Sequence, residues 1–240
     1  MSEIYRETAV GDVVARNPRT ATVFSRYGID FCCGGRRTIE DASVGAHLDP
    51  DRVVADLRAV TVFAAPEGDV SRWTAGRLID RIVTQHHAYV RAHAPTISGY
   101  LARLLAKHGS RHPELGRLAA LFADVNAELA RHMKHEEEVL FPAIAWLAGR
   151  HAGASARRID THLEQPIAEM EDEHEWAGRQ LALMRTLARG YQVPENACAT
   201  WKACYVALDD FEQDLHEHVH LENNVLFPLA RRLGKPAPLT

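Results

Sequence analysis

Residues 132–142 (HMKHEEEVLFP) and residues 218–228 (HVHLENNVLFP) share the pattern His-x-x-x-Glu-x-x-Val-Leu-Phe-Pro. Each copy places an imidazole and a carboxylate four residues apart, which is one turn apart on the same face of a helix. Two such pairs that face each other supply two nitrogens and two carboxylates to one cavity. The repeat therefore predicts a two-metal site carried by helices.

The composition is that of an ordinary soluble globular protein, because 46% of the 240 residues are hydrophobic and 25% are charged. A net charge of −4 offers no basic footprint for nucleic acid or an anionic membrane. The sequence has no apolar run long enough for a membrane span and no apolar segment of a secretory signal at its start. Four cysteines do not make a disulfide framework, so we expect a cytoplasmic protein.

The pattern of prolines and glycines divides the chain into three parts. Residues 1–62 are predicted to form a small helical N-terminal domain, in which Asp49 caps a helix that begins at Pro50 and reaches about Val60. Residues 63–73 are predicted to be a linker. Residues 74–240 are predicted to form an all-α, up-down-up-down four-helix bundle. Its helices are expected at about 74–107, with a bend at Pro95, and at about 113–139, 166–189 and 195–225.

The repeat extends beyond the two copies of the pattern, because isolated histidines precede them at similar intervals. His87 lies 45 residues before His132, and His174 lies 44 residues before His218. The predicted core seams place these groups where Leu or Val would otherwise stand. On the fourth helix the seam is Trp201, Cys204, Leu208, Phe211, Leu215, His218, Glu222 and Val225. On the third helix it is Leu163, Ile167, Met170, His174, Ala177, Leu181, Met184 and Ala188. On the second helix it ends with Leu129, His132, Glu136 and Val139.

Burial of several ionisable groups on these seams favours a metal site over a set of satisfied core histidines. A carboxylate buried without a strong partner costs several kcal/mol, and bound cations remove that cost. On the first helix, His86 and His87 both have apolar neighbours at helical spacing. The matched intervals favour His87, and His86 remains the alternative.

The predicted ligands are four imidazoles and two carboxylates: His87, His132, Glu136, His174, His218 and Glu222. This set suits iron or manganese best, with zinc and copper also possible. If both glutamates bridge, each metal receives two nitrogens and two carboxylate oxygens, and the metals lie about 3.5 Å apart. Glu128 and Glu173 are candidates for a second shell or a proton relay, or they are ordinary surface glutamates. Pro142 and Pro228 are expected to end or kink their helices.

With these residues in place, the chain resembles the RIC family, bacterial di-iron proteins for the repair of iron centres with a hemerythrin-like domain. The resemblance covers nearly the whole chain. It is carried by Asp30-Phe31-Cys32-Cys33-Gly34-Gly35, by the His86-His87 pair before Pro95, by His132-Met-Lys-His-Glu136, by Glu173-His174-Glu175 and by His218-Val-His-Leu-Glu222-Asn-Asn.

The resemblance implies a centre of two iron ions with oxo and carboxylate bridges, held by the same six ligands, with His108 near the iron. It also implies repair of iron–sulfur clusters damaged by oxidative or nitrosative stress through iron donation. The expected partners are damaged iron–sulfur proteins or a cluster-assembly scaffold, and small ligands such as nitric oxide or O2. Members of the family are cytoplasmic and commonly homodimers. A nitric oxide or peroxide reductase activity and a hemerythrin-like O2 or nitric oxide sensor remain alternatives.

Cys32 and Cys33 are adjacent and are followed by two glycines and by Arg36 and Arg37. Nearby cationic charge is expected to lower a thiol pKa and favour the reactive thiolate. A vicinal disulfide, a metal or cluster transfer, thiol exchange and a plain helix terminus remain open for the pair. Two further sets of residues are predicted to have no chemical role: Cys198 and Cys204 as structural cysteines, and His216 and His220 as histidines that face solvent.

Overall fold

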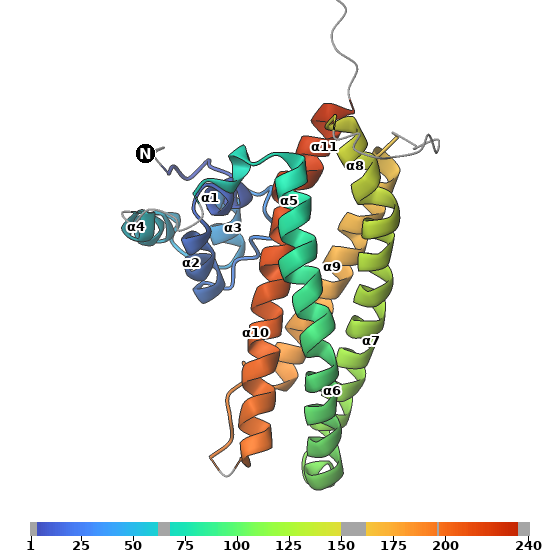
Figure 1. Ribbon diagram of the computed structural model, residues 1–240. Helices are drawn as coiled ribbons and strands as arrows, with labels where there is room; N and C mark the ends of the chain where they lie inside the picture. The colour runs from blue at the N-terminus through green and yellow to red at the C-terminus, as the bar shows by residue number, and fades with distance from the viewer. Residues whose placement is uncertain (1–3, 62–67, 150–161, 196, 235–240) are drawn as a thin grey trace, which may run out of the picture. The chain divides into compact units, whose positions relative to one another are not determined.

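The computed structural model is all-α, and it describes residues 4–61, 68–149, 162–195 and 197–234. Within these residues the only β pairing is one antiparallel bridge between Ala9 and Thr38. None of the described helices combines enough length and apolar character to cross a membrane. The fold class predicted from the sequence, an all-α protein with a helical N-terminal part, is confirmed (Figure 1).

Four short helices form the N-terminal part: α1 (Val10–Arg16), α2 (Ala21–Arg26), α3 (Ile39–Gly45) and α4 (Pro50–Thr61). Local capping explains where they start. Thr38 accepts a hydrogen bond from the Asp41 amide at the start of α3, and the Asp49 carboxylate accepts one from the Asp51 amide at the start of α4. The predicted cap and first residue of α4 are therefore confirmed. The apolar sides of these helices are buried through Val13, Phe24, Ile39, Val53 and Leu57.

Four long helices follow: α6 (Ala88–His108), α7 (Glu114–His135), α9 (Glu164–Leu187) and α10 (Ala199–Leu221). They run alongside one another with alternating direction (Figure 1). Two shorter α-helices, α5 (Ala75–Arg81) and α8 (Phe141–Leu147), adjoin α6 and α7, and α11 (Phe227–Leu233) follows α10. The predicted seams of the third and fourth helices are buried at every position. Pro95 lies inside α6, and the bend expected there stays a prediction.

Wide π-helical turns interrupt three of the long helices at the predicted ligands. The first, η3 (Ile82–His87), ends at His87. The other two, η4 (Glu136–Leu140) and η5 (Glu222–Leu226), begin at the glutamate of each repeat copy. Such turns are rare and occur frequently at functional sites.

These turns correct one half of the prediction for Pro142 and Pro228, that the helices end there; the other half, a kink, stays a prediction. In both copies an α-helix resumes at the phenylalanine, with the proline as its second residue. A proline has no N–H to donate, so it is tolerated in the first turn of a helix. The wide turn closes the preceding helix and starts a new first turn at the proline, so the chain continues in helical form.

The wide turn also corrects the end of the predicted seam on the second helix. Val139 was expected to face the core, but its side chain is 54% exposed, whereas Leu140 is 1% exposed. After Glu136 the fourth residue, Leu140, faces inward and the third does not, whereas in the second copy both Val225 and Leu226 are buried.

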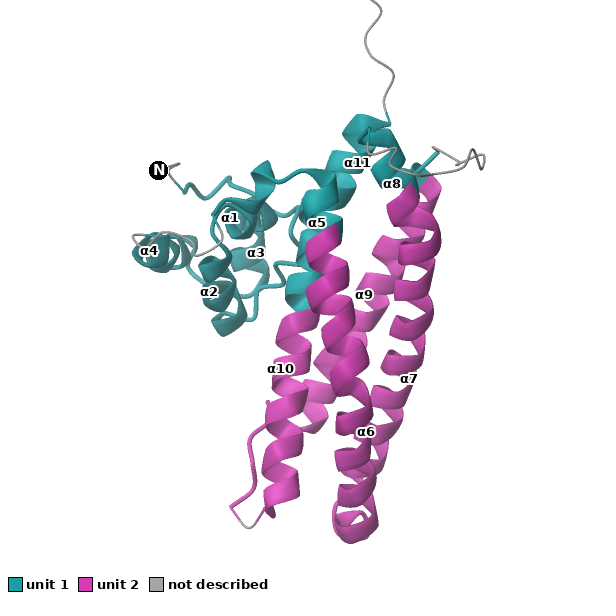
Figure 2. Cartoon of the chain, viewed as in Figure 1, with its two compact units in different colours: residues 1–79, 143–164, 216–240 teal, residues 80–142, 165–215 magenta. Residues whose placement is uncertain are grey.

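The structure divides into two compact units (Figure 2). Unit 1 contains residues 1–79, 143–164 and 216–240, and unit 2 contains residues 80–142 and 165–215. Helix α10 begins in unit 2 and ends in unit 1, because the boundary falls between Leu215 and His216. The division predicted from the sequence at residues 62 and 74 stays a prediction, and residues 62–67 of the predicted linker lie outside the described part of the chain.

Candidate metal centre

The six predicted ligands are buried, with side chains no more than 2% exposed. His87 is the last residue of η3, and Glu136 and Glu222 are the first residues of η4 and η5. The remaining three histidines lie on long helices: His132 on α7, His174 on α9 and His218 on α10. Four imidazoles and two carboxylates thus stand at buried positions that an apolar core would fill with Leu or Val.

The structure brings the six side chains into two groups of four that can each hold a metal ion. One group is His87, Glu136, His218 and Glu222, and the other is His132, Glu136, His174 and Glu222. Within each group the ligand atoms all lie within 4.8 Å of one another. Each group has its own two histidines, and both share the same two glutamates. This sharing is the arrangement that two bridging carboxylates require.

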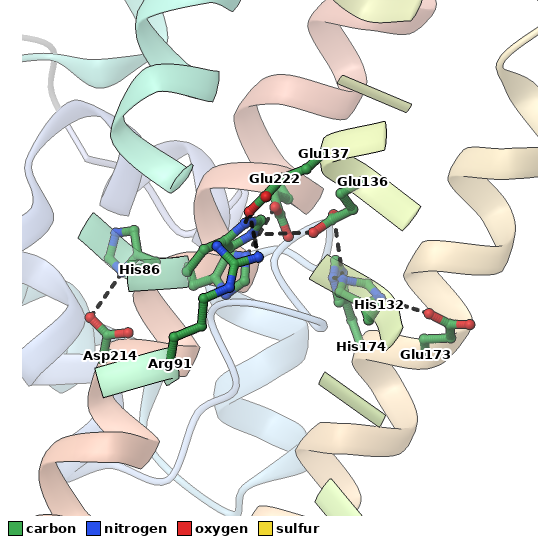
Figure 3. A network of polar contacts seen from close by, with 11 residues as sticks. His86, Arg91, His132, Glu136, Glu137, Glu173, His174, Asp214 and Glu222 are labelled. Carbon is green, nitrogen blue, oxygen red and sulfur yellow. Dashed lines mark hydrogen bonds and ion pairs between the residues drawn. The ribbon is translucent and has the colours of Figure 1, made fainter. Parts of the chain in front are cut away.

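The carboxylate of Glu136 faces two different histidines with its two oxygens. Its Oε1 lies 3.4 Å from Nε2 of His132 (Figure 3). Its Oε2 lies 3.3 Å from Nε2 of His87. In the second repeat copy, Oε1 of Glu222 lies 3.0 Å from Nε2 of His218. A carboxylate with one oxygen toward each of two imidazoles is placed to bridge two metal ions.

The Nε2 atoms of His132 and His174 are 3.0 Å apart. Two metal–nitrogen bonds of about 2.1 Å that meet at a right angle hold their nitrogens about 3.0 Å apart. The pair therefore fits two adjacent positions around one ion. A mixed nitrogen and oxygen set without thiolate is suited to iron or manganese.

Carboxylates behind the histidines fix which ring nitrogen faces inward. Nδ1 of His132 lies 2.6 Å from Oε2 of Glu173 (Figure 3). Nδ1 of His87 lies 2.6 Å from Oε1 of Glu137. An ionised carboxylate only accepts hydrogen bonds, so Nδ1 carries the proton and Nε2 presents its lone pair. Outer partners of this kind orient metal-binding histidines and raise their basicity.

Both outer glutamates are held in the charged form that this role needs. The hydrogen bond from His132 lowers the pKa of Glu173, with a smaller contribution from Arg131. Burial raises the pKa of Glu137, but hydrogen bonds from His87 and Arg91 outweigh it, and the resulting pKa is lowered.

Sequence reasoning named Glu173 for this role and missed Glu137. The structure gives Glu128 a different partner, because it pairs with Arg131 one turn away on the helix surface. Glu137 belongs to the run Glu136-Glu137-Glu138, which resembles a solvated surface segment. Its one available signal is its position directly after a predicted ligand.

His86 and His87 are both buried but have different partners. His86 contacts Asp214 through Nδ1 at 2.9 Å, and it belongs to neither of the two ligand groups (Figure 3). His87 belongs to one of them, and its ring stacks on Phe141 with centroids 5.9 Å apart. The geometry therefore supports the choice of His87 over His86.

The expectation that His108 lies near the metal is wrong. Helix α6 runs without interruption for 21 residues from Ala88 to His108. At about 1.5 Å per residue, its last residue lies roughly 30 Å from its first. His108 instead lies 3.5 Å from the sulfur of Cys198 and packs against Trp201.

The second predicted site, Cys32 and Cys33, lies in the loop between α2 and α3. Both are free thiols, with sulfurs 3.9 Å apart. The expected lowering of a thiol pKa by arginine is wrong for Cys32, and Arg37 donates to the carbonyl oxygen of Asp41. A hydrogen bond with Cys33, burial and the carboxylate of Asp30 raise the pKa of Cys32 well above its ordinary value.

The same loop corrects the prediction for His220, which was expected to face solvent. The side chain of His220 is 3% exposed, and its ring lies 5.9 Å from that of Phe31. Burial lowers its pKa to about 4, so the ring is neutral at pH 7. The expectation fails because it used only the seam of one helix, and the loop of the Asp30-Phe31-Cys32-Cys33 motif covers another face.

Comparisons with known proteins agree with this geometry. The profile of the hemerythrin HHE cation binding domain matches residues 78–230, and that of ScdA_N, a domain of unknown function (DUF542), matches residues 6–61. An "Iron-sulfur cluster repair protein YtfE" from Dickeya chrysanthemi is 33% identical over 95% of this chain and 98% of that protein. The chain belongs to the RIC family.

Other members of the RIC family are similar to the same degree. Proteins with the same name from Yersinia pestis (strain Pestoides F) and Yersinia pseudotuberculosis (serotype O:1b) are each 34% identical over 95% of this chain and 98% of their own length. The hemerythrin profile spans all six predicted ligands. The membership therefore agrees with a metal-binding site in the long-helix part of the chain, and the buried histidine and glutamate groups can hold that metal.

Proposed function

We propose that this RIC protein repairs iron–sulfur clusters damaged by oxidative or nitrosative stress, by donating iron from a labile non-haem di-iron centre. One observation carries the proposal: two groups of four buried ligands share Glu136 and Glu222, so the chain offers two adjacent metal positions. The relatives named as iron–sulfur cluster repair proteins support the role.

Iron fits this donor set because imidazole and carboxylate ligands without thiolate favour it over softer metals. Two bound irons would supply redox-active cations with positions open to a small molecule. The set of ligands would be His87 and His218 on one side, His132 and His174 on the other, and the two glutamates between them.

The protein's own residues support a site for two divalent ions. The carboxylates of Glu136 and Glu222, together with Glu173 and Glu137 behind the histidines, carry four negative charges. Arg91 donates to Glu137 over 2.8 Å and Arg131 contacts Glu173, so each outer carboxylate also faces an arginine. Glu136 and Glu222 are the carboxylates that both ligand groups share.

The partners remain proposals. A damaged iron–sulfur protein or a cluster-assembly scaffold would accept the iron, and nitric oxide or O2 would reach the same centre as small ligands. A homodimer and a cytoplasmic location, both expected from the family, are also proposals for this chain.

Two alternatives use the same site. An oxygen-carrying or sensing hemerythrin uses a set of five histidines, and the position of His108, roughly 30 Å along α6, removes the candidate for a fifth. A nitric oxide or peroxide reductase would also use an open di-iron site. It predicts steady turnover with an electron donor, whereas iron donation predicts one stoichiometric transfer per loaded centre.

The test uses the full-length, iron-loaded protein and a dehydratase whose cluster has been destroyed by nitric oxide. We expect the protein to restore activity beyond the level that an equal amount of free ferrous iron restores. The Glu136→Ala and Glu222→Ala double variant should lose two coupled irons in Mössbauer spectra and lose the restoration, whereas His108→Ala should keep both. Restoration equal to that of free iron contradicts the proposal, and a double variant that keeps coupled irons contradicts the ligand assignment.

A further inference from the structure

A second group of metal-binding side chains lies in the loop between α2 and α3, outside the histidine and glutamate groups. Ligand atoms of Asp30, Cys32 and Cys33 all lie within 4.8 Å of one another. The sulfurs of the two cysteines are 3.9 Å apart, and the sulfur of Cys32 lies 3.2 Å from Oδ1 of Asp30. Two thiols and a carboxylate thus converge on one point.

The spacing of the two sulfurs matches tetrahedral coordination. Metal–sulfur bonds of about 2.3 Å from two sulfurs 3.9 Å apart meet at about 116°. A bond of about 2.1 Å to Oδ1 of Asp30 then makes an angle of about 93° with the bond to Cys32, which is nearer to a right angle. The three atoms can therefore all reach one ion, with the two sulfurs at tetrahedral spacing.

A disulfide is a poorer use of the pair. Adjacent Cα atoms are 3.8 Å apart across a trans peptide, whereas ordinary disulfides join Cα atoms about 4.4–6.8 Å apart. A bond between Cys32 and Cys33 would therefore be strained.

The backbone of the loop is held in place before any ion binds. Oδ1 of Asp30 accepts hydrogen bonds from the amides of Cys32 and Cys33 at 3.0 and 2.9 Å. The side chain of Asn224 donates to the carbonyl oxygens of Phe31 and Cys32 at 3.2 and 2.9 Å. A loop fixed from both sides presents its ligands with little loss of entropy on binding.

We propose that Asp30, Cys32 and Cys33 form a second metal site, which binds one thiophilic divalent cation, Zn²⁺ or Fe²⁺, through two thiolates and one carboxylate. Binding forms two metal–sulfur bonds and one metal–oxygen bond, and the two thiol protons leave to the solvent. The fourth position stays open for a water or for a ligand from another protein. Sites with three protein ligands and one open position exchange ligands, unlike closed four-ligand structural sites.

The experiment titrates Co²⁺ under anaerobic conditions into the full-length protein whose histidine and glutamate site is already loaded with iron. Thiolate ligands give an intense near-ultraviolet charge-transfer band with Co²⁺, which imidazole and carboxylate ligands do not give. We expect one Co²⁺ per chain with this band, displaced by Zn²⁺. Parallel loading with ⁵⁷Fe²⁺ should give a ferrous thiolate Mössbauer signal in addition to that of the coupled pair.

The variants separate this site from other thiols. Cys32→Ser and Cys33→Ser should each weaken Co²⁺ binding at least tenfold and reduce the band. Asp30→Asn keeps an oxygen that can accept from both loop amides but loses the charge, and it should also weaken binding about tenfold, the scale seen when a metal site loses a supporting group. Cys198→Ser is the matched control and should change nothing. Circular dichroism of each variant confirms its helical fold.

Two results would overturn the proposal. One is that the wild-type protein gives no charge-transfer band. A thiol reagent must then react with all the thiols of the same sample after unfolding, which shows that they are reduced. The other is a band that survives in Cys32→Ser and Cys33→Ser but disappears in Cys198→Ser. Neither result bears on the di-iron centre, whose iron is measured separately in the same samples.

Discussion

The side-chain nitrogen of Asn224 donates to the carbonyl oxygen of Cys32 over 2.9 Å. Asn224 belongs to the π turn η5, which begins at Glu222. The loop that carries the cysteine pair is therefore held by a residue two positions after a predicted metal ligand. The turn and the loop are joined through the carbonyl oxygens of Phe31 and Cys32.

Replacement of Asn224 should release the cysteine loop. Asn224→Asp keeps the shape of the side chain but removes the donor and places a carboxylate against two carbonyl oxygens. We expect it to lower the free energy of unfolding by about 1 kcal/mol, because the lost hydrogen bonds are only half-buried. It should also speed the reaction of Cys32 with a thiol reagent. Urea unfolding and mass spectrometry of labelled peptides measure the two effects, and unchanged labelling would show that Asn224 does not hold the loop.

Gly35 and Asn224 should be energetically coupled. A Cβ atom added to Gly35 would lie 2.3 Å from Oδ1 of Asn224, so Gly35→Ala forces the asparagine side chain to move. Overpacking of this kind costs about 1–3 kcal/mol. In a background of Asn224→Ala the same change should cost much less, because the clashing atoms are gone. A double-mutant cycle from urea unfolding measures the difference, and additive effects would contradict the close packing.

Glu173 should tune the metal affinity of His132. Glu173→Gln keeps a group that can accept from Nδ1 of His132 but removes the charge, and we expect metal affinity to fall about 10- to 100-fold. Glu175→Gln is the matched control, because Glu175 lies on the same helix, is exposed and pairs with Arg179. Competition with a chromophoric chelator measures both variants. Equal affinities for the two variants would show that Glu173 has no role at the metal.

The parts of the site that follow a regular helical period could be read from the sequence. The spacing of His218 and Glu222 and the seam from Trp201 to Glu222 follow 3.6 residues per turn, and the structure buries every one of these positions. The π turns could not be read in this way. A proline such as Pro142 indicates that a helix is interrupted, but local sequence does not say whether the chain ends there or passes through a wider turn.

Contacts between distant segments set the other limits. His220 lies off the helix seam, and only the packing of Phe31 against it makes it a buried residue. Glu137 looks like a member of a surface run until His87, from another helix, contacts it. The error at His108 has a different source, since it came from the family resemblance, and the unbroken helix α6 overrules it.

Cys198 was predicted to be structural, but it should be the more reactive thiol when compared with Cys32. It immediately precedes α10, where the backbone N–H groups of Trp201 and Thr200 lower its pKa. Cys32 is buried and its pKa is raised. Brief treatment with iodoacetamide at pH 7 should therefore modify Cys198 first, because the thiolate is the attacking form. Peptide mass spectrometry gives the order, and faster labelling of Cys32 would contradict it.

Cys204 should make stability depend on alkaline pH. It lies on the core seam of α10, and burial raises its pKa to about 12. In the unfolded chain a cysteine loses its proton near pH 8.5, so above that pH the unfolded state binds fewer protons than the folded state, and stability falls as pH rises. The contribution is fully present below pH 8.5 and is lost toward pH 12. Between about pH 8.5 and 10.5, the urea midpoint of Cys204→Ala should therefore fall less than that of the wild type. If the two midpoints fall in parallel as pH rises, Cys204 ionises in the folded protein and the prediction is wrong.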